Sequence, residues 1–334
     1  DSFNVKTEPV KTNVFFTETS ATYLEIHDNL TFLKDGKGFI WTSEADGFNH
    51  IYLHDMSGKI MKKITNGSWD VTDFKGIDET TGALYYVSSE TSPTQRALYS
   101  KSLNETTGQD SKKKLSAQDG TNNPDFSTGY KYYINTHSSA NTPQYITLHS
   151  ADGKLIREIE KNEKLTQKMT EYQLTKKQFL KFTTSEGVIL NGWMMKPPDF
   201  NDTKKYPVYI SVYGGPGSNT VNDEWDRKHY FFHQMLAQKA YIVVSVDNRG
   251  TGNRGRDFRT CTYKQLGNIE TTDQIEAAKY LSTLPYVDKT RIGIQGWSYG
   301  GYMSALCITK GAEYFKMAIA VAPVSNWRYY DSIY

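Results

Sequence analysis

An internal repeat in the first half of the chain is the feature that most limits its possible folds. A turn glycine precedes an apolar, aromatic strand three times, at Gly36, Gly82 and Gly129, which lie 46 and 47 residues apart. Two further strands follow each glycine, centred on Tyr52, Tyr99 and Tyr145 and then on Ile64, Leu115 and Ile159. Strands and turns repeated at this period predict antiparallel propeller blades, each too small to bury its faces without a neighbour.

A closed propeller needs about four to eight blades, and this sequence supplies about three. We therefore expect residues 1–168 to form the C-terminal blades of a partial β-propeller, with the remaining blades upstream in a longer protein. The alternative is three unrelated antiparallel meanders. The repeat is favoured because two separate strand positions keep the same period.

From about residue 170 the pattern changes to strands that alternate with helices, which predicts a mostly parallel sheet covered by helices. We expect strands at 179–182, 188–195, 208–212, 241–246 and 292–294, and helices at 224–238 and 271–281. Residues 169–334 are thus predicted to be the N-terminal part of an α/β-hydrolase domain.

The charge balance and the cysteine content exclude several classes of function. The chain has 39 Lys and Arg against 37 Asp and Glu, spread along the sequence, so no basic surface indicates nucleic acid. Only Cys261 and Cys307 are present, and they form no Cys-x-x-Cys pair. His229 and His233 have the spacing of two zinc ligands, but Tyr230 stands where a general base is required. We expect no metal and no cofactor.

A Gly-x-Ser-x-Gly motif marks the candidate nucleophile, Ser298. It spans Gly296 to Gly300, follows the expected strand at 292–294 and precedes the helical pattern of 302–306. On a sharp strand-to-helix turn a serine is exposed in a strained conformation, and the flanking glycines let neighbouring backbone pass close by. The flanking strand and helix make this motif more specific than its spacing alone.

Serine needs donors that stabilise the oxyanion formed on the attacked carbonyl. In this fold one donor is the backbone N–H after the nucleophile, here that of Tyr299, and another comes from a loop after an earlier strand. The glycine-rich loop Tyr213 to Gly217 follows the expected strand at 208–212. From composition alone, Tyr213 is better interpreted as a buried aromatic at a strand end than as a donor.

The rest of the triad is not found in this chain. In an α/β-hydrolase the acid and the histidine follow the serine, but all seven histidines precede Ser298 and few acids follow it, among them Asp331. We therefore expect the catalytic Asp and His after Tyr334, and both ends of the chain to be cut from a larger protein. The chain by itself is expected to be close to inactive.

The stretches Gly296 to Tyr302, Ala320 to Tyr334, Tyr213 to Pro216 and Asp247 to Gly250 resemble the dipeptidyl peptidase IV group of the prolyl oligopeptidase family. The resemblance is strong over about residues 170–334 and weaker over the repeats. It implies that Ser298 is the nucleophile and that the Tyr213 hydroxyl and the Tyr299 N–H form the oxyanion hole, which reverses the composition-based interpretation of Tyr213. The family's proline pocket would be lined by Tyr299, Val324, Trp327, Tyr330 and Tyr334.

The resulting hypothesis is a serine exopeptidase that releases N-terminal dipeptides with Pro or Ala at the penultimate position through an acyl-enzyme. The expected partners are peptides that begin Xaa-Pro or Xaa-Ala, and the full-length protein could form a homodimer. The alternatives are an esterase or lipase on the same fold, a tripeptidyl or oligopeptidase specificity, and a non-catalytic binding module. Family members act outside the cytoplasm, and the scarcity of cysteine favours a bacterial periplasmic protein.

One further motif argues for a different function. Gly250, Gly252 and Gly255 match the Gly-x-Gly-x-x-Gly dinucleotide fingerprint, with Asp273 about 20 residues on. The third glycine of that fingerprint opens a helix, and residues 256–263 are poor helix formers. We therefore expect no dinucleotide site here.

Overall fold

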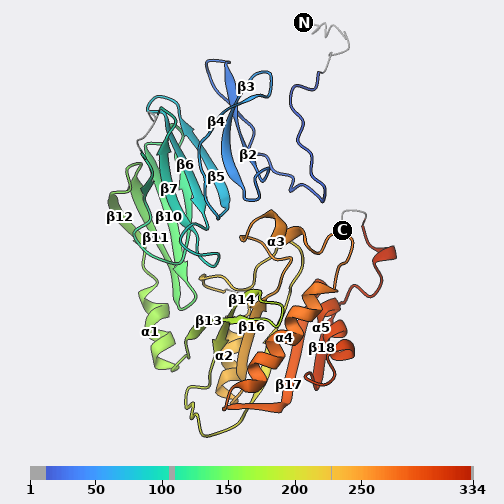
Figure 1. Ribbon diagram of the computed structural model, residues 1–334. Helices are drawn as coiled ribbons and strands as arrows, with labels where there is room; N and C mark the ends of the chain where they lie inside the picture. Colours follow the sequence, from blue (N-terminus) through green and yellow to red (C-terminus); the bar gives the residue numbers. More distant parts are fainter. Residues whose placement is uncertain (1–12, 105–109, 227, 332–334) are drawn as a thin grey trace, which may run out of the picture.

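The computed structural model describes residues 13–104, 110–226 and 228–331. Three four-stranded sheets built from the first half of the chain precede one six-stranded sheet built from the second half (Figure 1). Every strand pair in the first three sheets is antiparallel, as the repeat predicts. Within these ranges, no helix is both long enough and apolar enough to cross a bilayer.

Each of the first three sheets contains its strands in chain order. The first contains β1 (Thr31–Phe32), β2 (Gly38–Ser43), β3 (His50–Asp55) and β4 (Ile60–Lys63). The second contains β5 (Val71–Asp78), β6 (Ala83–Ser88), β7 (Ala97–Ser102) and β8 (Lys113–Lys114). The third contains β9 (Thr121–Phe126), β10 (Tyr132–Ser139), β11 (Thr142–Ser150) and β12 (Leu155–Glu160).

The repeated glycines stand at the turn before the second strand of each sheet. Gly36, Gly82 and Gly129 have φ of 68°, 73° and 78°, the left-handed region that glycine enters without steric cost. The sequence pattern located the three strands after each glycine but missed the strand before it, namely β1, β5 and β9. Each sheet therefore has one strand more than we expected.

Neighbouring sheets bury each other's apolar faces. Ile40 and Ile51 of the first sheet share a buried cluster with Leu84 and Tyr86 of the second. The opposite face of the second sheet, which carries Tyr85, packs in another cluster with side chains of the third sheet. A sheet of this size cannot bury both faces alone, so this stacking provides the core of the first half.

The six-stranded sheet has the order β13-β14-β16-β15-β17-β18. The hairpin β13–β14 joins it antiparallel to β16, and β16, β15, β17 and β18 are mutually parallel. The strands are β13 (Lys177–Thr183), β14 (Ile189–Met195), β15 (Tyr206–Ser211), β16 (Ile242–Asp247), β17 (Val287–Trp297) and β18 (Met317–Val321). The helices are α1 (Glu163–Glu171), α2 (Tyr230–Gln238), α3 (Arg256–Thr260), α4 (Ile269–Thr283) and α5 (Tyr299–Lys310), followed by the 3₁₀ turn η1 (Trp327–Tyr329).

Helices cover both faces of this sheet because side chains alternate along each strand. Val208 and Ile210 of β15 pack in the large cluster that includes side chains of α4 and α5. Tyr209, between them, lies in the cluster on the other face, which includes Ala237 of α2. The predicted α/β architecture is therefore present, and the expected boundary at residue 168 falls inside α1, which connects the two parts.

Two helix predictions were wrong. Helix α2 begins at Tyr230 rather than at residue 224, because the Asp226 carboxylate accepts the N–H groups of Lys228 and His229, and the Trp225 N–H donates to Ser138 of β10. Residues 256–260, expected to be non-helical, form the short helix α3. Its start is fixed by the Gly255 N–H, which donates to the Asp70 carboxylate at 2.9 Å.

The loops after β15 and β16 make many of the contacts between the two parts of the chain, and Asn141 adds two hydrogen bonds to the backbone of Lys177 in β13. Asp223, in the loop after β15, accepts the Gln95 amide and the Ala140 N–H, both at 2.9 Å. Arg259 of α3, after β16, pairs with Glu44. In Figure 1 the antiparallel sheets accordingly lie over the end of the six-stranded sheet from which these loops emerge. Ligands of open α/β sheets bind at this carboxyl end of the strands.

Candidate active site

Ser298 occupies the turn between β17 and α5. Its backbone has φ 58° and ψ −115°, a conformation that residues other than glycine rarely adopt. Its N–H donates to the Val321 carbonyl at 2.9 Å, and its own carbonyl accepts the Tyr302 N–H at 3.0 Å as α5 begins. Ser298 is partly exposed and lies outside the packed core. The predicted strand–serine–helix turn is therefore present.

Two glycines bring the serine turn into contact with the end of β15. A Cβ atom on Gly296 would lie 2.4 Å from the Val212 carbonyl oxygen, and one on Gly300 would lie 2.2 Å from the same atom. Real Cβ atoms do not approach backbone so closely, so both positions require glycine. The close approach places the turn beside Tyr213, the residue after Val212.

Tyr213 lies next to the serine turn, as the family resemblance implies for an oxyanion donor. A Cβ on Gly300 would be 3.1 Å from the Tyr213 Cα, and the Tyr213 ring centroid is 6.1 Å from that of Tyr299. The Tyr213 side chain is half-buried, so it is not sealed in the core as composition alone suggested. Its role as a donor stays a prediction.

Asn248 holds the loop that carries Tyr213. Its amide donates to the Gly214 carbonyl at 3.0 Å, and its side-chain oxygen accepts the Gln274 amide of α4, also at 3.0 Å. Both Asn248 and Gln274 are fully buried. The position of the Tyr213 loop is therefore tied to α4 by a buried chain of amides.

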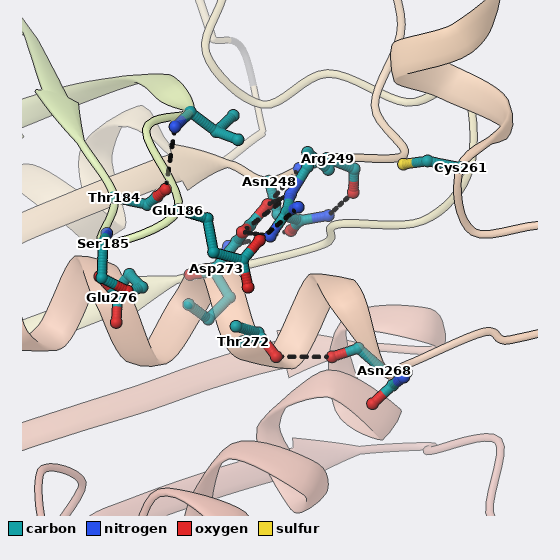
Figure 2. A network of polar contacts seen from close by, with 12 residues as sticks. Thr184, Ser185, Glu186, Asn248, Arg249, Cys261, Asn268, Thr272, Asp273 and Glu276 are labelled. Carbon is teal, nitrogen blue, oxygen red and sulfur yellow. Dashed lines mark hydrogen bonds and ion pairs between the residues drawn. The ribbon is translucent and has the colours of Figure 1, made fainter.

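The residue after Asn248 strengthens this link, as Figure 2 shows. The Arg249 guanidinium binds the buried Asp273 carboxylate, with Nη2 2.7 Å from Oδ1, and the Arg249 backbone N–H donates to the same carboxylate at 2.7 Å. A third contact joins Arg249 to Glu186 at 2.7 Å. The hydrogen bonds to Asp273 raise the pKa of Arg249 above its usual range. Burial acts in the opposite direction on Asp273 and raises the pKa of its carboxyl. The loop after β16 is thus fixed by several hydrogen bonds to one buried carboxyl.

Tyr299 begins α5, and its side chain points inward. It is only 1% exposed, and its phenol donates to the Glu270 carboxylate of α4 at 2.5 Å. Its ring centroid is 5.6 Å from that of Trp327. Burial, together with the neighbouring Glu270, raises the pKa of Tyr299. The phenol therefore remains protonated and can act as a donor at neutral pH.

The residues assigned to the proline pocket lie beyond β18. Trp327 packs against Tyr299 and lies 5.5 Å, centroid to centroid, from Tyr330, which is 43% exposed. Val324 is half-buried in the same segment, and Tyr334 lies outside the described residues. The structure thus brings Tyr213, Tyr299, Trp327 and Tyr330 into one row of aromatic rings that includes the residue directly after Ser298. Their assignment to a proline pocket stays a prediction.

Sequence reasoning missed the polar residues that support this site. Glu270, Asp273 and Gln274 are completely buried. They lie on a helix whose predicted apolar face was Ile275, Ala278 and Leu281. One signal in the sequence could have indicated them: polar side chains fill the first turns of a helix that must pack on a sheet. Among the described residues, no group of three or more His, Cys, Asp or Glu is placed to hold a metal ion.

Comparisons with known proteins match both halves of the chain. Residues 2–144 match the dipeptidyl peptidase IV N-terminal region, and residues 229–334 match the prolyl oligopeptidase family. A probable dipeptidyl peptidase 4 from Aspergillus flavus is 34% identical over 306 residues, which are 89% of this chain and 38% of the relative. Dipeptidyl peptidase 4 from Trichophyton equinum is 35% identical over 315 residues, or 92% of this chain and 40% of the relative.

Solved structures give the same result. The structure of Porphyromonas gingivalis dipeptidyl peptidase 4 matches with a TM-score of 0.86 and 45% identity, over 92% of this chain and 42% of that one. A putative dipeptidyl aminopeptidase IV from Bacteroides ovatus matches with a TM-score of 0.83 and 28% identity, over 93% and 46%. The chain spans about two fifths of the length of the curated relatives that it matches. Residues 229–334 of the chain thus match the prolyl oligopeptidase family, residues 2–144 match the N-terminal region of dipeptidyl peptidase IV, and the relatives described here carry dipeptidyl peptidase names.

Proposed function

We propose that the full-length protein is a serine exopeptidase that releases N-terminal dipeptides with Pro or Ala at the penultimate position. The reaction forms an acyl-enzyme on Ser298 and then hydrolyses it. The observation that carries this proposal is the backbone of Ser298, held at φ 58° on the turn between β17 and α5. Such strain is retained where the surrounding structure enforces it, and it presents the hydroxyl at the carboxyl end of the sheet.

Negative charge that develops on the attacked carbonyl would be stabilised by the Tyr213 hydroxyl and the Tyr299 N–H. Two observations support these roles. Tyr213 follows Val212, whose carbonyl touches the glycines of the serine turn, and Tyr299 is the first residue of α5. The N-terminus of a helix favours negative charge, and donors held by a rigid scaffold need no reorganisation during the reaction.

The row of aromatic rings that includes Tyr299 supports a preference for proline. A pyrrolidine ring is flat and rigid, so it loses little conformational freedom on entering a slot walled by Tyr299, Trp327 and Tyr330. Alanine at the same position would leave part of that slot unfilled. Loss of one or two methylene contacts in a hydrophobic pocket costs about 1–3 kcal/mol, so proline should be preferred without alanine being excluded.

The architecture of the full-length protein is part of the proposal. We infer that the three antiparallel sheets of residues 1–168 are consecutive propeller blades and that residues 169–334 belong to the hydrolase domain, with the remaining triad groups supplied from beyond Tyr334. We further infer that the protein acts in a bacterial periplasm and forms a homodimer. Cell fractionation and light scattering on the full-length protein test these last two inferences.

The test of function is Ser298→Ala in the full-length protein, assayed with an Ala-Pro anilide, an Ala-Ala anilide and a simple ester. We expect the variant to lose turnover of both anilides by several orders of magnitude. Ser304→Ala is the matched control, because Ser304 also lies in the α5 region but donates to the Gly300 carbonyl at 2.8 Å. Unchanged anilide turnover in Ser298→Ala rules out the acyl-enzyme role. A wild-type protein active on the ester alone indicates an esterase, and one active on neither indicates a binding module.

A further inference from the structure

Glu270 is a buried carboxyl with a single side-chain partner. It stands in the first turn of α4 and is 0% exposed. One oxygen, Oε1, accepts the Tyr299 phenol at 2.5 Å, whereas Oε2 has no hydrogen-bond partner among the described residues. No described lysine, arginine or histidine forms an ion pair with Glu270. The backbone groups of Gly267 and of Glu270 itself also act on the carboxyl. A buried carboxyl without a cationic partner still destabilises the fold, so its presence calls for an explanation other than stability.

The partner of Glu270 is the residue that links the nucleophile to the aromatic row. Tyr299 follows Ser298 directly, and its ring lies between those of Tyr213 and Trp327, with centroid distances of 6.1 and 5.6 Å. The phenol oxygen is the one polar atom of this side chain, and a swing of the side chain about its Cα–Cβ bond would break the bond to Glu270. The bond therefore holds the ring in its place between Tyr213 and Trp327, although it leaves the ring free to flip about its own long axis.

We propose that Glu270 is a positioning residue that holds the Tyr299 ring between Tyr213 and Trp327 and thereby sets the preference for proline over alanine. This inference rests on the proposed peptidase function, and it adds to that function a residue that lies outside the aromatic row. A ring held at its phenol end forms a rigid wall for a pyrrolidine ring. A ring that is free to tilt would accept alanine almost as well as proline.

The charge of the carboxylate is part of this role. A hydrogen bond to an ionised acceptor is roughly twice as strong as one between neutral groups. Burial raises the pKa of Glu270, and the nearby charge of Asp273 on the same helix raises it further, while the Tyr299 hydrogen bond opposes both effects. As the pH falls through this raised pKa, the carboxyl becomes neutral and its hold on Tyr299 weakens. The preference for proline over alanine should therefore decrease as the pH is lowered.

Other titratable groups surround this pair. Tyr302 of α5 adds to the rise in the pKa of Tyr299. The charge of Glu270 likewise adds to the rise in the pKa of the Cys261 thiol that burial causes. Arg249, whose charge also acts on the Cys261 thiol, is bound to Asp273. Burial raises the pKa of the Cys261 thiol, so this group stays neutral at acidic and neutral pH. The acid dependence of selectivity should therefore follow Glu270.

The experiment compares the full-length wild type with Glu270→Gln on Ala-Pro and Ala-Ala anilides and follows the ratio of the two kcat/KM values with pH. Titration of the catalytic base acts on both reporters and cancels in this ratio. We expect the ratio to be roughly tenfold lower in the variant at neutral pH and to lose its acid dependence, because glutamine keeps only a neutral hydrogen bond. Tyr299→Phe should give the same result, and the double variant should add nothing. A variant ratio equal to that of the wild type at every pH overturns the inference.

Glu276→Gln is the matched control. Glu276 lies on the same helix and is also shielded, but its carboxylate binds Lys279 and the Ser185 N–H rather than the Tyr299 phenol. We expect this variant to leave the proline-to-alanine ratio and its pH profile unchanged. An equal fall of the ratio in Glu276→Gln would show that any lost carboxylate on α4 has this effect, and the role assigned to Glu270 would be wrong.

A crystal structure of Glu270→Ala decides the positioning step without any turnover, and Glu270→Gln replaces it if the alanine variant does not fold. We expect the Tyr299 ring to leave its place between Tyr213 and Trp327 or to occupy several orientations. A single, unmoved ring overturns the inference whether or not the protein is a peptidase. Conversely, a wild-type protein that cleaves neither anilide overturns the proposed function, and the structure of the variant still decides the role of Glu270.

Discussion

Gly300 faces the carbonyl of Val212 so closely that a Cβ atom at position 300 would lie 2.2 Å from that oxygen. The contact joins the first turn of α5 to the residue just after β15. Ser298 stands two residues before Gly300, and Tyr213 stands one residue after Val212. The distance between the proposed nucleophile and the expected oxyanion donor is therefore set by backbone packed directly on backbone.

Gly300→Ala should consequently lower activity at the site more than it lowers the stability of helix α5. The added methyl group must push α5 away from β15, and overpacking of this kind costs about 1–3 kcal/mol. A displacement of about 1 Å between reacting groups can lower the rate about a hundredfold. We expect kcat/KM on an Ala-Pro anilide to fall by about that factor while the protein stays folded by circular dichroism. Thr309→Ala, at an exposed position of the same helix, should change neither, and full activity in Gly300→Ala would show that the contact is not needed.

Arg249→Lys tests the network that supports the Tyr213 loop. Lysine cannot reproduce the two-pronged contact of the guanidinium with Asp273, whose carboxylate is 0% exposed. We expect a loss of about 2–3 kcal/mol in the free energy of unfolding, measured by urea denaturation. Glu186→Gln removes the exposed partner of the same arginine and should cost less than about 1 kcal/mol. Equal losses in the two variants would mean that burial of Asp273 does not strengthen the pair.

His233 should make the fold sensitive to acid. It lies at the interior face of α2, 3% exposed, close to Lys177, and burial lowers its pKa from 6.5 to about 4. Between these two values the unfolded chain binds a proton that the folded protein does not bind, so stability falls as the pH drops through this range. The loss approaches about 3 kcal/mol.

The measurement is the difference in unfolding free energy between pH 7 and pH 4.5, in wild type and in His233→Gln. We expect this difference to be smaller in the variant, because glutamine does not titrate. His229→Gln is the control, since the His229 side chain is 65% exposed one turn earlier. An unaltered pH dependence in His233→Gln would show that other groups cause the acid sensitivity.

Asp223 should couple the two parts of the chain. It lies in the loop after β15, and its two carboxylate oxygens accept hydrogen bonds from Gln95 and Ala140 of the antiparallel sheets. Asp223→Ala leaves both donors without this acceptor, at a cost of about 1–3 kcal/mol. We expect calorimetry to resolve separate unfolding transitions for the two parts. Asp202→Asn, at an exposed loop position, should unfold as the wild type does, and one unsplit transition in Asp223→Ala would contradict the coupling role.

The sequence predicted the architecture well where a single local rule decides the structure. The turn glycines, the buried strand β16 and the serine turn each follow from side-chain pattern and backbone freedom alone. The strands β1, β5 and β9 were missed because they are short or polar; β9, for example, reads Thr-Asn-Asn-Pro-Asp-Phe. Their pairing with the next strand comes from the sheet and not from their own propensity.

The site was predicted only in part, for a related physical reason. Ser298 and Tyr213 could be placed because their neighbours are glycines with a backbone role. Glu270 and Asn248 could not, because a buried polar side chain is recognised by its partners, and these partners are distant in sequence. The prediction for the N-terminal part of the expected helix at 224–238 was wrong for the same reason. The Asp226 carboxylate binds local N–H groups and the Trp225 N–H binds Ser138, so these residues are not helical.

The backbone angles of Ser298 have one more consequence. Glycine would adopt φ 58° and ψ −115° with less strain than serine, by about 1–3 kcal/mol. If sequences were chosen for thermal robustness alone, position 298 would hold a third glycine between Gly296 and Gly300. A serine at that position, against the conformational preference of its own backbone, is what we expect if the proposed reactivity of Ser298 is selected at the expense of stability.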